Sequence, residues 1–149
     1  MSPIQQPNPE ALDNLTDASN LTADQLMFWV GQKLHPDVPL HNLPSIFTIS
    51  QAIELASFRA AFQTLVNSSD ALRMVIEEVD DIPQYRIKPA GPYDIPYLDF
   101  SDKAEPEAVL QAWVADRAPR MFDIENSLFD TALIKLSSQK FVWYFNQHH

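Results

Sequence analysis

The chain has 149 residues, of which 46% are hydrophobic, and ten Lys and Arg against twenty Asp and Glu give it a net charge of −10. This composition fits one soluble globular domain, and its acidity excludes the basic surface that a binder of nucleic acid or of anionic membranes needs. The chain has no cysteine, which excludes disulfides and fits a cytoplasmic location; no apolar run is long enough to span a bilayer, and two glycines are too few for a phosphate-binding loop.

The N-terminal part is expected to divide into a leader and a helix. Residues 1–20 contain several prolines and many short polar side chains without periodicity, which predicts a flexible leader. Thr22 and Gln25 then have the spacing of a capping box, which marks the start of a helix. Apolar residues follow at helical spacing, and Pro36 ends the helix.

The middle of the chain alternates between strand and helix patterns. Residues 43–50 predict a strand, and residues 55–66 carry the clearest amphipathic helix pattern in the chain. Two further strands are expected at residues 72–79 and 84–88, joined through residues 80–83. Residues 89–96 hold several turn-forming residues, so we expect no regular element there.

The C-terminal part predicts one helix and one hairpin. Pro106 fits the first turn of a helix that Pro119 terminates. Residues 129–136 and 141–147 then read as two apolar strands paired across residues 137–140. Because helices and strands mix throughout the chain, the predicted class is α/β or α+β, with a central mixed sheet and helices packed on it.

The last two residues, His148 and His149, follow the most apolar of these strands. An imidazole at the end of a buried strand suits acyl-transfer chemistry, because it exchanges a proton near neutral pH. Adjacent strand residues point to opposite faces, so only one of the two side chains can face a given site. The same divergence disfavours a metal site, for which His35 and His41 are the other histidines available.

Several short segments can be compared with known motifs. Leu21–Trp29 is similar to L-S-x-A-Q-x-R-x-W, and His41–Pro44 is similar to Y-N-I-P; Phe47–Ile49 and the helix that follows match the next strand and helix of the pattern. Asp70–Arg73 occupies the place of the motif R-H-E-x-L-R-T-x-F, and Phe122–Phe129 is similar to P-F-D-L-x-x-G-P-L-F. His148–His149 stands where the motif H-H-x-x-x-D-G begins. In this order and spacing, residues 21–149 resemble the condensation domain of nonribosomal peptide synthetases.

The resemblance implies a fold and a division of the chain. A condensation domain is a pair of lobes, each like chloramphenicol acetyltransferase. Residues 21–149 would form the N-terminal lobe, and the chain would stop inside the histidine motif, with the C-terminal lobe absent. Without that lobe we expect an incompletely covered apolar face around Phe141, Trp143 and Phe145, which would drive self-association.

The resemblance also implies a reaction, site residues and partners. The intact protein would form amide bonds between aminoacyl or acyl thioesters carried on the phosphopantetheine of carrier proteins, without a directly bound cofactor or metal. His149 would carry the proton of the attacking amine or orient that amine, and His148 and Arg73 would support the site structurally. The partners implied are donor and acceptor carrier proteins, the C-terminal lobe and an upstream synthetase subunit. The fragment by itself would be inactive.

Departures from the family pattern leave alternatives open. Met27 stands where the first motif has Arg, Ser68 and Ser69 replace Arg-His, and Asp130 lies where Arg is commoner. One alternative is an ester-forming acyltransferase of the same superfamily, and another is a degenerate lobe that only binds carrier proteins. The terminal His-His pair could also be a chance pair or the remnant of an affinity tag.

Overall fold

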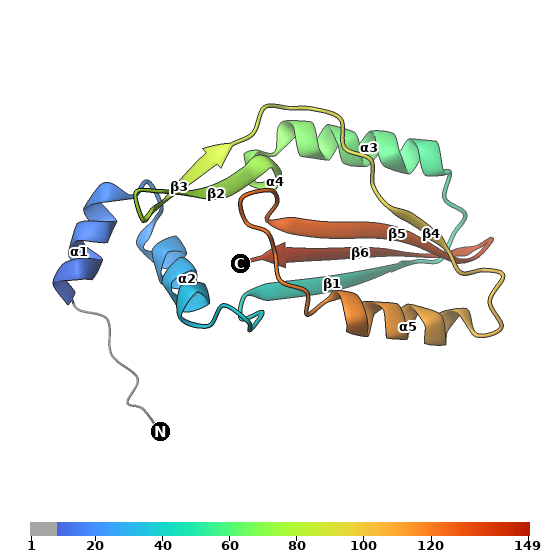
Figure 1. The fold of residues 1–149 in the computed structure, drawn as a ribbon. Coiled ribbons are helices and arrows are strands. Elements are labelled where there is room, and N and C mark those ends of the chain that lie inside the picture. The colour runs from blue at the N-terminus through green and yellow to red at the C-terminus, as the bar shows by residue number, and fades with distance from the viewer. Residues whose placement is uncertain (1–8) are drawn as a thin grey trace, which may run out of the picture.

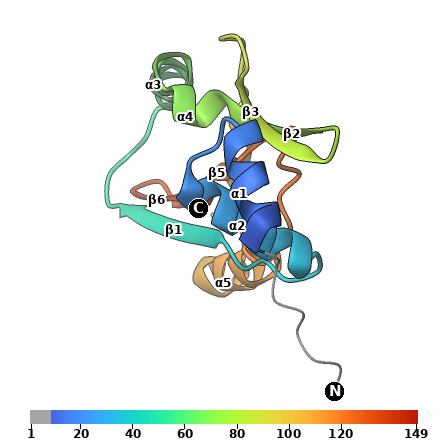
Figure 2. The same cartoon turned by 90° about the vertical axis from the view of Figure 1, so that its left-hand side faces the viewer.

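In the computed structural model, which describes residues 9–149, a four-stranded sheet lies between two long helices (Figures 1 and 2). Its strand order is β1–β6–β5–β4. Strand β6 (Lys140–His148) is antiparallel to both β1 (Asn42–Ile49) and β5 (Phe129–Ser137), whereas β4 (Tyr97–Asp99) is parallel to β5. The predicted class, a mixed sheet with helices packed on it, is therefore confirmed.

The two faces of the sheet are covered by different helices, α3 (Leu55–Ser68) and α5 (Pro106–Arg117). Figure 2 shows these helices on opposite sides of the strands. Alternate residues of β5 and β6 supply the two cores, because side chains alternate between the faces of a strand. The core under α3 contains Phe62, Val66, Phe129, Leu133 and Phe141, and the core under α5 contains Leu110, Ala132, Ile134, Leu136, Val142 and Tyr144.

The helix α2 (Ala23–Leu34) begins as the sequence predicts. Thr22 is its N-cap, and the reciprocal hydrogen bonds between Thr22 and Gln25 form a complete capping box. The helix lies beside the C-terminal end of β6, as Figure 1 shows. Leu26 on α2 packs into a third core cluster with Leu21 and Ile76, so this cluster joins α2 to the strand that contains Ile76.

Part of the segment that the sequence predicts as a flexible leader is helical in the structure. Residues 1–8 lie outside the described residues, but Pro9–Ala18 forms the helix α1. Proline is favoured in the first turn of a helix, and Leu15 adds a tertiary contact by packing against the cluster around Leu21 and Leu26. Asn20 then hydrogen-bonds in both directions with the backbone of Tyr85, at 3.0 and 2.7 Å, which fixes the segment that follows α1.

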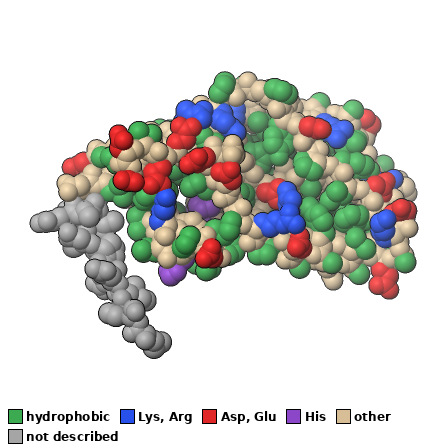
Figure 3. Space-filling view, in the orientation of Figure 1, with side chains coloured by type: hydrophobic (Ala, Val, Ile, Leu, Met, Phe, Trp, Pro, Cys, Tyr) green, Lys and Arg blue, Asp and Glu red, His purple; other side chains and the backbone are tan. Residues whose placement is uncertain are grey.

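The predicted middle hairpin exists with shifted boundaries. A single helical turn, α4 (Asp70–Arg73), takes the place of the expected first strand residues. The strands β2 (Met74–Val79) and β3 (Ile82–Ile87) then pair as a separate two-stranded sheet. Acidic side chains gather on the surface over this hairpin (Figure 3). Strand β4 was not predicted, because its three residues follow the turn-forming stretch directly.

The apolar surface that stays open is larger on β1 than on β6. Phe141 is buried, but Trp143 and Phe145 are only partly buried against the core under α3, so the face around them is incompletely covered, as the sequence suggests. Strand β1 at the sheet edge is more exposed: Ile46 and Phe47 are 49% and 48% accessible. Among residues 9–149, none of the helices has the length and apolarity needed to cross a bilayer.

Candidate active site

The C-terminal end of β6 is held by backbone hydrogen bonds on both sides. The amide of His148 donates to the carbonyl of Leu128 at 2.8 Å, and the amide of His149 donates to the carbonyl of His41 at 2.9 Å. Leu128 precedes β5, and His41 precedes β1. The two terminal histidines are therefore positioned by two segments that are distant from them and from each other in the sequence.

The imidazoles of His148 and His149 lie in different surroundings. The His148 ring is partly buried and lies 5.6 Å from the His41 ring and 6.0 Å from Phe122, between ring centroids. Its Nε2 atom is buried without a hydrogen-bond partner. Burial, reinforced by the nearby His41, lowers the pKa of His148, so the neutral form is favoured. The ring of His149 rests 4.5 Å from Phe28, and the residue is exposed.

A cavity of about 230 Å³ lies next to these histidines. Four segments enclose it: α2, the region from α4 into β2, the loop before β5, and the end of β6. Its lining residues are Gln25, Phe28, Trp29, Gln32, Ala71, Leu72, Met74, Ile76, Ile124, Leu128, Phe129, Gln147, His148 and His149. An apolar cavity with an accessible imidazole on its wall can hold a substrate chain while the imidazole reaches a reacting group.

Arg73, the third residue singled out in the sequence, lies on a different cavity. Its guanidinium donates to the carbonyl of Lys88 at 2.7 Å and to the carboxylate of Asp70 at 2.5 Å. The cavity that Arg73 lines, with Lys88 and Tyr93 among its other walls, does not include the histidines. In the described chain Arg73 thus braces the junction between α4 and the end of β3.

Sequence reasoning missed two contributors to the histidine site, His41 and Phe28. Both contact the terminal histidines through their rings, and their own rings are 4.8 Å apart. The sequence offers His41 as one of the histidines of a disfavoured metal site and as part of the motif similar to Y-N-I-P, but neither pattern places it beside His148. Its carbonyl and ring act together, because one holds the backbone of His149 while the other packs on His148.

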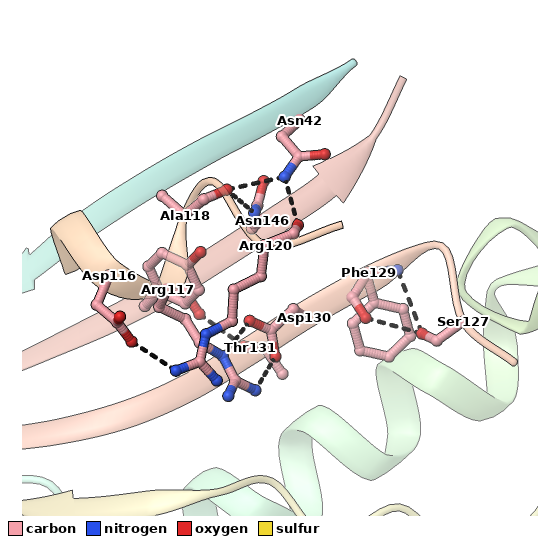
Figure 4. Close-up of polar contacts among 11 residues, drawn as sticks. Asn42, Asp116, Arg117, Ala118, Arg120, Ser127, Phe129, Asp130, Thr131 and Asn146 are labelled. Atoms are coloured by element: carbon pink, nitrogen blue, oxygen red, sulfur yellow. Dashed lines mark hydrogen bonds and ion pairs between the residues drawn. The ribbon is translucent and has the colours of Figure 1, made fainter. Parts of the chain in front are cut away.

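A polar network fixes the strands that carry the site (Figure 4). The side-chain amide of Asn42 donates to the carbonyls of Ala118 and Arg120, both at 2.8 Å, and Asn146 donates to Ala118 at 3.2 Å. Asn42 lies opposite His148 in the register of β1 and β6. The segment after α5 is therefore tied to the strand ends beside the histidines.

Asp130, which departs from the family pattern, has a clear partner. Its two carboxylate oxygens accept from the guanidinium of Arg117, both at 2.7 Å, in a bidentate ion pair (Figure 4). Bidentate pairs of this kind are among the stronger polar contacts in proteins. The pair raises the pKa of Arg117 and joins α5 to β5, so this position supports the packing of α5 on the sheet.

Within residues 9–149, no group of three or more His, Cys, Asp or Glu side chains is arranged to hold a metal ion. His41 and His148 are close, but they form a pair only.

Comparison with known proteins identifies relatives over nearly the whole chain. The family model described as Condensation domain matches residues 16–149. The isonitrile lipopeptide synthase of Streptomyces coeruleorubidus is 28% identical in an alignment of 149 positions that covers 96% of this chain and 10% of that protein. A dimodular nonribosomal peptide synthase of Bacillus subtilis (strain 168) is 27% identical over 131 residues, 87% of this chain and 6% of the relative.

Solved structures agree with this match. The starter condensation domain of rhizomide synthetase superposes with a TM-score of 0.77 at 34% identity, over 87% of this chain and 32% of that domain. A mutant of the same domain in complex with C8-CoA gives a TM-score of 0.79 at 31% identity, over 94% of this chain and 33% of that one. The chain thus spans about a third of these domains and a tenth or less of the synthases above. With a family match that extends over most of its residues, the chain belongs to the condensation domain family.

Proposed function

We propose that the protein containing this chain forms an amide bond between a thioester-bound acyl or aminoacyl donor and an amine acceptor, both tethered to carrier proteins by phosphopantetheine. Family membership supports the reaction class, and relatives named as nonribosomal peptide synthases support the setting. The proposal includes a cytoplasmic location, which the cysteine-free composition fits. An upstream synthetase subunit is a further proposed partner.

The observation that carries the proposal is the placement of the His149 imidazole. It is exposed on the wall of an apolar cavity, while the backbone amide of His149 is fixed by the His41 carbonyl. A fixed base beside a bound thioester lowers the barrier by proximity and by proton transfer.

In the proposed reaction the amine nitrogen attacks the thioester carbonyl and forms the new C–N bond. The tetrahedral intermediate then collapses, the C–S bond breaks, and the thiolate leaves. The His149 imidazole takes the proton from the attacking nitrogen and returns it to the sulfur, so no other reactant is needed. His148, kept neutral by burial, and Arg73, bound to Asp70 and Lys88, act as structural supports. Residues 1–149 alone are proposed to be inactive, because they span about a third of the solved condensation domains.

The test is an amide-formation assay on the full-length protein with carrier-bound donor and acceptor. His149→Ala should lower turnover by roughly 10²–10⁴-fold, the usual contribution of a positioned acid–base group. His35→Ala is the matched control, because His35 is an exposed histidine that does not line the cavity. Turnover by His149→Ala close to that of the control would reject the role of His149. A preference for a hydroxyl over an amine acceptor would favour the ester-forming alternative, and carrier binding without turnover would favour the non-catalytic one.

A further inference from the structure

We propose that the side chain of His41 is a positioning residue: acting through Phe28, it holds the imidazole of His149 in the orientation that proton transfer requires. The role rests on the proposed function and adds to it a residue that lies outside the cavity. Three features of the structure carry it: a row of ring contacts that ends at His149, the packing of His41 against α2, and the backbone anchor between His41 and His149.

The imidazole of His149 packs on an aromatic neighbour. The residue is exposed, and its ring lies 4.5 Å from the ring of Phe28, between centroids, at an interplanar angle of 57°. Exposed side chains exchange rotamers rapidly unless a contact holds them. The orientation of the His149 imidazole therefore depends on how firmly the Phe28 ring is held.

His41 supports the ring of Phe28. The two rings meet edge to face, 4.8 Å between centroids at an angle of 68°, which is a favourable geometry for aromatic pairs. The His41 ring also meets the His148 ring edge to face, at 5.6 Å and 67°. Because the backbone of His148 is paired with β1, opposite Asn42, this end of the row belongs to the sheet. The contacts thus lead from the sheet to the exposed imidazole, in the order His148, His41, Phe28 and His149.

The His41 ring is placed by packing. It is partly buried, and its Nε2 atom has no hydrogen-bond partner among the described residues. This atom lies beside α2 at Gly31, where a Cβ atom would be 3.4 Å away. Glycine inside a helix lowers its stability, and here the missing side chain leaves room for the imidazole against the helix. Shape rather than a hydrogen bond therefore sets the position of this ring.

The backbone of His41 has a separate task. Its carbonyl accepts the amide of His149 at 2.9 Å, which fixes the main chain of His149. This bond does not involve the His41 side chain, and every substitution at residue 41 retains the carbonyl. Loss of the ring should therefore change the orientation of the His149 imidazole and keep the position of its main chain.

This separation predicts which kinetic constant changes. The cavity beside His149 is lined by Phe28 but not by His41, so the surface that would hold the donor remains when the His41 ring is lost. Proton transfer, in contrast, depends on an imidazole that points at the reacting nitrogen, and a small misplacement of a catalytic group is costly. His41→Ala should therefore lower kcat by about 10²-fold and leave KM close to that of the wild-type protein.

Steady-state amide formation by the full-length protein, with carrier-bound donor and acceptor, tests this role. His41→Phe keeps a planar ring without the imidazole nitrogens and should recover most of the kcat that His41→Ala loses. His35→Ala is the matched control, because His35 is exposed and does not line the cavity. Melting curves check that each variant is folded.

Three kinetic outcomes would overturn the role. The first is a kcat of His41→Ala equal to that of the control. The second is an equal loss of kcat in folded His41→Ala and His41→Phe, because the imidazole itself and not its ring packing would then matter. The third is a change confined to KM.

A second measurement reports the orientation of His149 without turnover. Diethyl pyrocarbonate labels accessible neutral imidazoles, and mass spectrometry with fragmentation gives the labelling rate at His149 relative to that at His35 in the same sample. His41→Ala should raise this ratio by about two- to tenfold, the population change that corresponds to the loss of one aromatic pair. His41→Phe should keep the wild-type ratio. A ratio that His41→Ala leaves unchanged would overturn the role.

The two measurements separate this role from the proposed function. A protein that forms no amide but shows the expected labelling ratios would retain the orienting contact and lose the proposed reaction. A protein whose turnover depends on His149, while His41→Ala changes neither kcat nor labelling, would retain the proposed function and lose the role of His41.

Discussion

At the scale of single residues, the burial of His148 should make the stability of the protein depend on pH. Its folded pKa lies below the unfolded value of 6.5, because burial and the neighbouring His41 disfavour the charged ring. Below the unfolded pKa the unfolded chain binds more protons than the folded one. The free energy of unfolding therefore falls as the pH decreases from about 6.5 toward the lowered folded pKa.

Thermal unfolding followed between pH 7.5 and pH 5 checks this dependence. The melting temperature should fall toward the acid end, and His148→Gln should flatten the slope because the titrating ring is gone. His35→Gln, which removes an exposed imidazole, should retain the wild-type slope. Equal slopes for the two variants would show that His148 is not responsible.

Arg73 should contribute to stability through its geometry as well as its charge. Its side chain is 16% exposed and bonds to both Asp70 and the Lys88 carbonyl. Arg73→Ala should lower the free energy of unfolding by about 1.5–3 kcal/mol, the range for hydrogen bonds to charged groups. Arg73→Lys should recover only part of the loss, because lysine lacks the planar fork. Urea denaturation measures both, and full recovery by lysine would mean that charge alone matters.

At the scale of elements, the turn between β2 and β3 carries local strain. Asp80 and Asp81 both have positive φ, 51° and 63°, as the two central residues of a tight hairpin turn require. Aspartate tolerates this region better than most residues, but glycine fits it without a steric cost. Asp81→Gly should therefore raise the free energy of unfolding by roughly 0.5–1 kcal/mol, and Asp81→Val should lower it. A stabilising Asp81→Val in urea denaturation would contradict this reading of the turn.

Elements with strong local patterns were predictable from the sequence, and those fixed by distant contacts were not. The Thr22–Gln25 capping box and the C-terminal hairpin follow from spacing alone. Helix α1 has apolar residues at helical spacing, Ala11, Leu15 and Ala18, but the prolines and short polar side chains around them obscured the pattern, and its Leu15 is held by contacts with residues further along the chain. The residues of the histidine site were likewise predictable only where a local motif marked them. His149 could be singled out from its motif, whereas the contact of His41 with His148 depends on the pairing of β1 with β6.

At the scale of the whole molecule, β1 leaves an apolar edge open to solvent. The strand has no charged residue from Asn42 to Ile49, and Leu43, Ile46 and Phe47 are each more than 40% accessible. Edge strands of this kind pair with other chains unless a charge, a proline or a covering element blocks them, and in β1 Pro44 stands near the start and leaves residues 45–49 open. Residues 1–149 should therefore self-associate with increasing concentration through β1.

Sedimentation velocity at several concentrations tests this association. Ile46→Lys places a charge on the edge and should shift the chain toward monomer. Val79→Lys, a charge at another exposed apolar residue on the separate β2–β3 hairpin, is the control and should leave the association unchanged. A wild-type chain that remains monomeric throughout would show that the open edge does not drive association.

The paired anchoring of the end of β6 also has a dynamic consequence. The amides of His148 and His149 donate to two segments that belong to different parts of the chain, so both segments must separate before these amides meet solvent. Amide hydrogen–deuterium exchange at these two positions should therefore be slow for the end of a strand, and should report local opening rather than simple fraying. Leu128 belongs both to an anchor and to the cavity wall. An occupied cavity should consequently slow the exchange of the His148 amide, linking the lifetime of the closed site to the presence of its ligand.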